Sequence, residues 1–125
     1  HAGDSRAYKV SQKGIVQMTR DHSIVQELLE TGRLTPNEAK AHPRKNIITR
    51  ALGVDETVDI DFCEDRMEPE DVLLLCTDGL TNYLETDEIF QITRNSGYYE
   101  SAQQMVDLAN QHGGGDNITV VAITY

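Results

Sequence analysis

Three aspartates in this 125-residue chain stand beside glycines next to expected strands. Asp78 follows the apolar run 72–76, Asp116 follows three consecutive glycines, and Asp4 comes just before a strand-like segment. A carboxylate at the end of a buried strand is costly unless it has a partner, and hard divalent cations bind several oxygen ligands. Two such ions a few ångströms apart can hold a hydroxide and the oxygens of a phosphoryl group at once. The three aspartates together therefore indicate a metal centre suited to phosphate-ester hydrolysis.

Each of these motifs also has an ordinary structural interpretation. Asp78 and Gly79 can form a simple turn, and residues 113–117 can be a loop whose Asp and Asn bond their own backbone. Asp4 can pair with Arg6 at the start of a strand. A phosphate-binding P-loop is excluded for the glycine-rich stretch, because no helix N-terminus with a lysine follows it. The four histidines show no ligand spacing, and we interpret them as cap, turn or surface residues.

The elements that must position the aspartates are strands and helices in alternation, which predicts an α/β fold. At roughly 150 residues per domain, the whole chain 1–125 is expected to form a single domain. The periodicity predicts a hairpin over 6–19 and two short helices within 21–46. Further along, we expect a strand at 58–63, a central strand at 72–76 buried on both faces, helices that begin at 86 and 101, and a final strand at 118–124.

Composition narrows the classes of partner and compartment. The chain has 11 Lys and Arg against 21 Asp and Glu, which gives a net charge of −10. Such an acidic chain repels nucleic-acid backbones and anionic lipids, so neither is an expected partner. No apolar run approaches the roughly 20 residues that cross a bilayer. Cys63 and Cys76 do not make a disulfide framework, and as two buried thiols they favour a reducing, cytoplasmic compartment.

Five motifs occur in an order and at a spacing typical of one family. They are GDSRAY at 3–8, TRDHS at 19–23, ITRALG at 48–53, LLCTDGL at 74–80 and GGDNITVV at 114–121. The sequence resembles the metal-dependent serine/threonine protein phosphatases, known as the PPM or type-2C family, and in particular their bacterial members. The resemblance extends along essentially the whole chain, and the combination of motifs makes it specific.

The resemblance implies part of a four-layer α-β-β-α sandwich with a helical flap at 21–46. It implies dephosphorylation of phosphoserine and phosphothreonine in proteins by attack of a metal-bound hydroxide, with manganese or magnesium as cofactor. Asp78 and Asp116 would bind the two central ions, Asp4 with Asp78 would hold a third, weaker ion, and no side chain would act as a catalytic nucleophile. Asn46, where the flap returns to the core, would bind substrate. The implied partners are phosphoproteins and a serine/threonine kinase of a bacterial signalling system.

The chain departs from the family pattern in one large respect. It begins at the GDSRAY strand and resembles the C-terminal half of the catalytic domain, without the upstream Asp-Gly motif whose Asp bridges the two central metals. We therefore expect this chain by itself to be incomplete for catalysis. Unpaired sheet edges and apolar faces predict self-association. The alternative is a non-catalytic interaction or regulatory module with a phosphatase-like half-fold.

Overall fold

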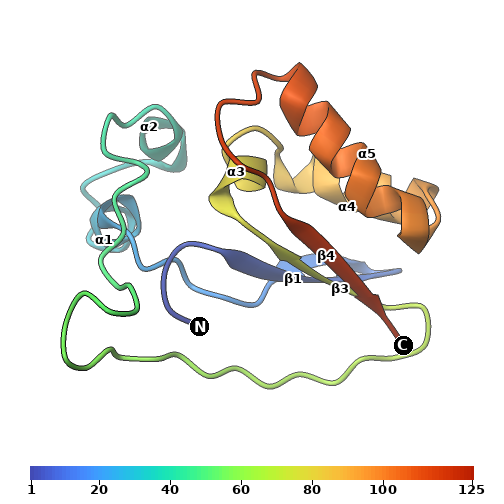
Figure 1. Cartoon of the computed structure of the whole chain (residues 1–125), viewed down its shortest axis with the longest axis horizontal. Coiled ribbons are helices and arrows are strands. Elements are labelled where there is room, and N and C mark those ends of the chain that lie inside the picture. Colours follow the sequence, from blue (N-terminus) through green and yellow to red (C-terminus); the bar gives the residue numbers. More distant parts are fainter. The chain divides into compact units, whose positions relative to one another are not determined.

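The computed structural model describes residues 1–125, which divide into two units. The helical unit contains residues 1–5 and 20–62, and the sheet unit contains residues 6–19 and 63–125. Figure 1 shows the course of the chain through its elements.

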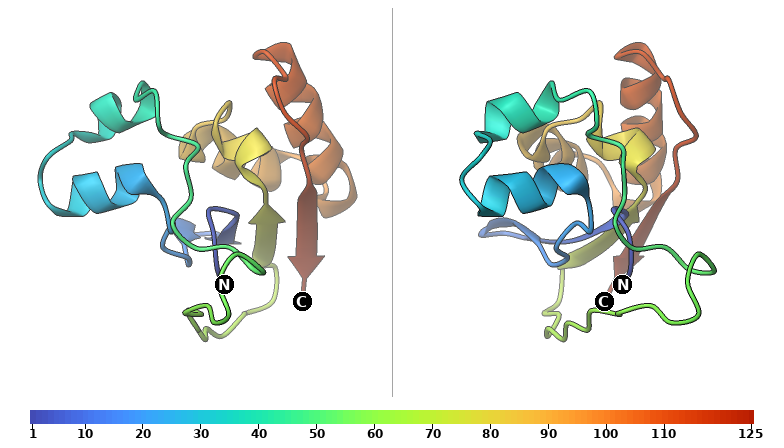
Figure 2. Two further views of the ribbon diagram at one scale, coloured as in Figure 1. Left: turned by 60° about the vertical axis from the view of Figure 1, so that its left-hand side comes forward. Right: turned by 90° about the vertical axis from the view of Figure 1, so that its left-hand side faces the viewer.

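One antiparallel sheet of four strands forms the sheet unit, in the order β2-β1-β3-β4. The strands are β1 (Arg6–Ser11), β2 (Gly14–Gln17), β3 (Val72–Cys76) and β4 (Val120–Thr124). The hairpin predicted over 6–19 is confirmed as β1 and β2, and β3 is the central strand between β1 and β4. Figure 2 shows β3 and β4 side by side in opposite directions. The end of β3 therefore lies beside the start of β4.

Helices cover one face of this sheet. They are α3 (Asp78–Thr81), α4 (Thr86–Asn95) and α5 (Tyr98–Gln111), and Figure 1 shows α4 and α5 on the same side. Tyr8 and Leu74 point from the sheet into a core that Ile89 of α4 and Met105 of α5 complete, each at most 1% exposed. Burial of such apolar side chains contributes about 1.5–3 kcal/mol each. The predicted α/β class is confirmed, with an antiparallel sheet and helices packed on it.

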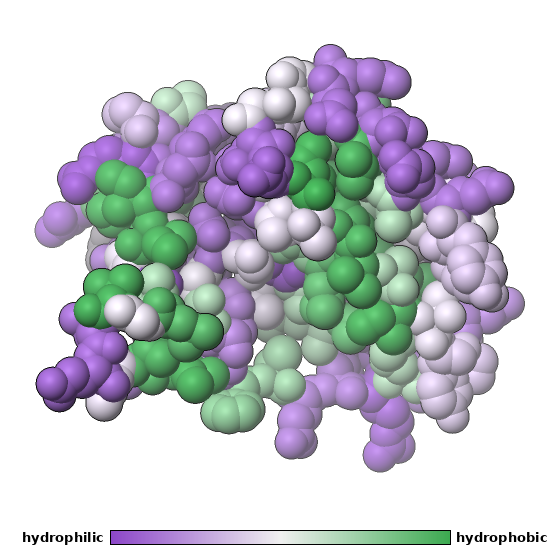
Figure 3. All heavy atoms as spheres, in the orientation of Figure 1, coloured by the Kyte–Doolittle hydropathy of each residue, from purple (hydrophilic) through white to green (hydrophobic).

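The other face of the sheet remains open within the sheet unit. Leu74 is buried, but its neighbour Leu75 is 41% exposed, and Val121, the partner of Leu75 in β4, is 45% exposed. Figure 3 shows hydrophobic side chains gathered along β4. Our prediction that the strand at 72–76 is buried on both faces is therefore wrong. A uniformly apolar run does not distinguish burial on one face from burial on two.

Two short helices dominate the helical unit, as predicted for 21–46. They are α1 (Ile24–Glu30) and α2 (Pro36–Lys40), and Figure 2 shows them side by side. Ser23 caps α1 by accepting a hydrogen bond from the Gln26 N–H, and Thr35 caps α2 in the same way through the Glu38 N–H. Such caps contribute about 1 kcal/mol each. No helix of the chain combines the length and the apolar character that a bilayer crossing requires.

The strand predicted at 58–63 does not form. This segment has no partner strand, and Phe62 is 92% exposed. Alternation of apolar and acidic residues is compatible with a strand, but a strand needs a neighbour to receive its backbone hydrogen bonds. The sheet ends at β2 and β4, and the segment pairs with neither of these edge strands. Cys63 at the end of the segment is exposed, contrary to our expectation, whereas Cys76 is buried, and both thiols are free.

Candidate metal centre

Asp78 begins α3 immediately beyond the end of β3. Between them, Thr77 donates its N–H to the Thr119 carbonyl (3.1 Å) and accepts the Thr119 N–H on its own Oγ1 (3.0 Å). These two bonds extend the contact between β3 and β4 past the last paired residues, Cys76 and Val120. They use the Thr77 hydroxyl, which consequently does not cap α3. The residues that precede Asp78 are thereby fixed against the segment that leads into β4.

Gly79 permits a close approach that no other residue would allow. A Cβ at this position would lie 2.1 Å from the Asn117 carbonyl oxygen and 2.9 Å from its carbon. The turn of Asp116 and Asn117 therefore packs directly on the first turn of α3. Within the turn, the Asp116 Oδ1 accepts the Asn117 N–H at 2.7 Å. This packing brings Asp78 and Asp116 onto two segments that touch.

Tyr83 supports the glycine-rich loop that carries Asp116. The Gly115 N–H donates to the Tyr83 hydroxyl at 3.0 Å, and a Cβ at Gly115 would lie 2.3 Å from that oxygen. The Tyr83 carbonyl lies 3.0 Å from the His112 Nδ1 at the end of α5. Sequence reasoning missed this residue, because a single tyrosine between an expected strand and an expected helix carries no signal for a contact 32 positions away.

Asp4 and Asn46 belong to the helical unit rather than to the sheet unit. Asp4 is partly buried and follows Gly3, whose N–H and carbonyl are both hydrogen-bonded to His22. Asn46 is exposed in the turn that follows α2, next to Ile47, whose N–H donates to the Arg44 carbonyl. The structure thus brings Asp78 and Asp116 together within one unit, and it holds Asp4 and Asn46 in the other.

The histidines differ in part from what we expected. His22 is 1% exposed and therefore is not a surface residue. Its ring contacts the Gly3 N–H and the Asp61 carboxylate. The sequence shows only an Asp-His-Ser signal for a helix start, and the partners that bury the ring are 19 and 39 positions away.

The donor set of this chain fits a divalent cation in part. The carboxylates of Asp78 and Asp116 are the hard oxygen ligands that manganese and magnesium bind. The chain contains no group of three or more His, Cys, Asp or Glu side chains arranged to hold a metal ion. Two carboxylates leave most of an octahedral coordination sphere to water or to other groups. They fit a metal centre as part of its ligands rather than as a complete cage.

Comparison with known proteins assigns the class of the chain. Residues 1–118 match the family model of Protein phosphatase 2C, and the chain belongs to this family, as the motifs predicted. It is 43% identical to the serine/threonine phosphatase Stp of Listeria welshimeri, over 98% of this chain and 49% of that protein. The structure of the S. agalactiae serine/threonine phosphatase has a TM-score of 0.91 at 41% identity, over 98% of this chain and 51% of that one.

A further solved structure concerns the metal. The catalytic domain of the serine/threonine protein phosphatase PstP, solved in complex with two manganese ions, has a TM-score of 0.82 at 36% identity. The match covers 98% of this chain and 50% of that domain. The chain thus spans about half the length of the relatives that it matches.

Proposed function

We propose that the chain is part of a metal-dependent phosphatase that removes phosphate from phosphoserine and phosphothreonine in proteins. The observation that carries the proposal is the packing of the Asp116 turn on Gly79, next to Asp78. Family membership supports it, since the relative in Listeria welshimeri is named a serine/threonine phosphatase.

Asp78 and Asp116 would hold divalent cations, manganese or magnesium, at this end of the sheet. When bound, such ions lower the pKa of a water molecule and offset the charge of the phosphoryl oxygens. The two carboxylates bind and orient, and neither is proposed as a nucleophile. Their contribution depends on rigid placement, which β3 and α3 supply for Asp78 and the Asn117 N–H supplies for Asp116.

The remaining proposed site residues belong to the helical unit. Asp4 is assigned as the ligand of a third, weaker ion, and residues 21–46 as the flap, with Asn46 binding substrate at its C-terminal end. These assignments rest on the family resemblance. The residues of α2 other than Ala39 are exposed, which is consistent with a flap, because an exposed polar helix can present a surface to a protein substrate.

The proposed partners are phosphoprotein substrates and a serine/threonine kinase of a bacterial signalling system. The net charge of −10 opposes nucleic acid as an alternative partner. We place the protein in the cytoplasm, a compartment in which the free thiols of Cys63 and Cys76 would stay reduced.

A second candidate is a non-catalytic interaction or regulatory module with a phosphatase-like half-fold. The observation that favours it is the lack of any cluster of three or more metal-ligating side chains in the chain. This candidate concerns the 125-residue chain alone, and the activity of the complete protein would remain that of a phosphatase.

Hydrolysis of a phosphothreonine peptide tests both candidates. The complete protein should turn over the peptide with Mn²⁺ and stop when a chelator is added, and Asp78→Asn or Asp116→Asn should abolish this turnover. Asp55→Asn, at an exposed loop position, is the matched control and should have no effect. Full activity of either site variant would contradict the ligand assignment. Turnover by the 125-residue chain would refute the second candidate, and a folded but inactive chain would support it.

A further inference from the structure

His22 is a buried imidazole with a partner at each ring nitrogen. The Gly3 N–H lies 3.1 Å from Nδ1, and the Asp61 Oδ2 lies 2.7 Å from Nε2. A backbone N–H can only donate, so Nδ1 must accept and must carry no proton. The ring proton is then on Nε2, where it is donated to the Asp61 carboxylate. The two contacts therefore fix one neutral tautomer of His22.

The main chain of His22 also forms hydrogen bonds, one of them with Gly3. Its N–H donates to the Gly3 carbonyl at 2.8 Å, and its own carbonyl accepts the Thr49 N–H at 2.8 Å. The Gly3 carbonyl and the Asp4 nitrogen belong to one planar peptide group. His22 thus forms hydrogen bonds with both the N–H and the carbonyl of Gly3. These bonds fix the orientation of the Gly3–Asp4 peptide group.

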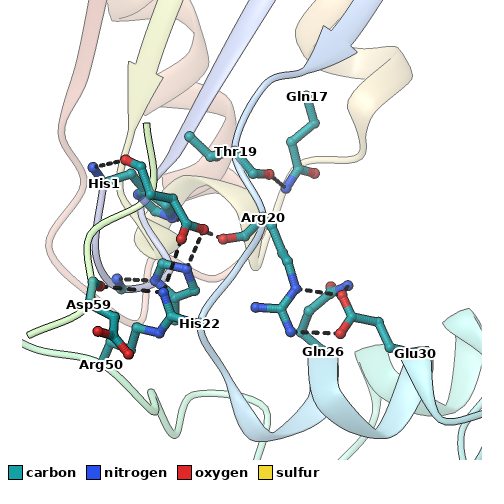
Figure 4. Close-up of polar contacts among 11 residues, drawn as sticks. His1, Gln17, Thr19, Arg20, His22, Gln26, Glu30, Arg50 and Asp59 are labelled. Atoms are coloured by element: carbon teal, nitrogen blue, oxygen red, sulfur yellow. Dashed lines mark hydrogen bonds and ion pairs between the residues drawn. The ribbon is translucent and has the colours of Figure 1, made fainter. Parts of the chain in front are cut away.

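Asp61 contacts the Nε2 side of the His22 ring and is itself bound by Arg50. The Arg50 Nη1 lies 3.0 Å from the Asp61 Oδ1 and 3.3 Å from the Asp59 carbonyl oxygen, and Figure 4 shows these contacts beside His22. The hydrogen bond from His22, aided by Arg50, lowers the pKa of the Asp61 carboxyl. Asp61 therefore stays an ionised acceptor, which keeps the proton of His22 on Nε2.

We infer that His22 is a positioning residue that orients the Gly3–Asp4 peptide, and that Asp61 and Arg50 hold its ring in the required tautomer. The inference rests on the proposed function, because the role of Asp4 as a metal ligand is part of that proposal. Side chains that orient a metal ligand typically change metal affinity about 10–100-fold when they are replaced. His22 also lies at the start of the proposed flap, residues 21–46, and the next residue, Ser23, caps α1.

Two substitutions of similar polarity distinguish the contact at Nδ1 from the contact at Nε2. His22→Asn keeps an acceptor oxygen near the place of Nδ1, for Gly3, but cannot reach Asp61. His22→Gln keeps a donor near the place of Nε2, for Asp61, but offers Gly3 no acceptor. Both remove ring volume from the same buried site, so a general loss of stability affects both, whereas loss of positioning affects His22→Gln alone.

Nitrogen-15 NMR and hydrogen exchange test the positioning directly in the complete protein. The wild-type ring should show a protonated Nε2 and a bare Nδ1, and the Gly3 amide should exchange at least about tenfold faster in His22→Gln than in His22→Asn. A protonated Nδ1 in the wild type, or equal exchange in the two variants, would overturn the inference.

Titration with Mn²⁺ alone, followed by electron paramagnetic resonance, tests the consequence for metal binding. The weakest Mn²⁺ site should lose about tenfold or more in affinity in His22→Gln and in Asp4→Asn, and less than about threefold in His22→Asn. Wild-type affinity in His22→Gln together with weak binding in Asp4→Asn overturns the role of His22. Wild-type affinity in Asp4→Asn instead overturns the ligand assignment of Asp4, and the exchange of the Gly3 amide then decides the positioning separately.

Discussion

Replacement of Gly79 by alanine should separate the two segments that carry the proposed metal ligands. The added Cβ would lie 2.1 Å from the Asn117 carbonyl oxygen, whereas contacts of real Cβ atoms essentially never fall below 3.0 Å. The Asp116 turn and α3 must therefore move apart by about 0.9 Å, the difference between these two distances, and the obstacle is backbone that cannot rotate away. Overpacking of this kind costs about 1–3 kcal/mol.

Urea denaturation of Gly79→Ala measures this cost, and Gly97→Ala is the matched control. Gly97 has an ordinary φ of −58°, and apart from its chain neighbours no atom lies within 4 Å of the place that a Cβ would take. Gly97 is also the N-cap of α5, where alanine is less favourable than glycine, so its replacement should lower the free energy of unfolding by at most about 1 kcal/mol. In the complete protein, Gly79→Ala should also lower phosphatase turnover on the order of 100-fold, because a shift of about 1 Å disrupts a reacting geometry. Equal stability of the two alanine variants would refute the close packing of the turn on Gly79.

Three further predictions concern the loop, the helical unit and the open face of the sheet. Tyr83→Phe removes the acceptor of the Gly115 N–H and should lower the free energy of unfolding by about 0.5–1.5 kcal/mol. If urea denaturation shows the same stability as the wild type, Tyr83 does not support the glycine-rich loop. The hydrogen bonds from Arg20 lower the pKa of Glu30 from 4.5 to about 2, so the pair stabilises the fold above pH 4.5 and loses this effect as the pH falls toward 2. The excess stability of the wild type over Glu30→Gln, measured by urea denaturation at about pH 7, 4 and 3, should therefore shrink with falling pH, and a constant difference would refute the pairing. The 125-residue chain should self-associate, and light scattering measures its mass in solution. Val121→Lys places a charge on the open face of the sheet and should weaken the self-association. A wild-type chain that is monomeric at all concentrations would contradict this prediction.

Local signals in the sequence were sufficient for much of the fold. Ser23 and Thr35 cap α1 and α2 as the sequence indicates, since a cap depends on residues only two or three positions away. The hairpin over 6–19 and the strands that precede Asp78 and lead out of Asp116 also follow from local alternation and apolar runs. These strands put both aspartates at strand ends, and the antiparallel pairing of β3 with β4 brings those ends together.

Features that depend on distant partners could not be predicted in this way. Residues 58–63 alternate like a strand, but they pair with no strand of the sheet. Leu75 belongs to an apolar run whose outward face the sequence alone does not reveal. Tyr83 and His22 have long-range partners, and neither partner is close enough in the sequence to produce a pattern.

The most direct test of the proposed metal centre is the position of manganese in crystals of the complete protein grown with Mn²⁺. An anomalous difference map taken at the manganese edge identifies the ion without assumptions about its ligands. We predict manganese bound to carboxylate oxygens of both Asp78 and Asp116. Manganese bound elsewhere, with both of these carboxylates free of metal, would contradict the assignment.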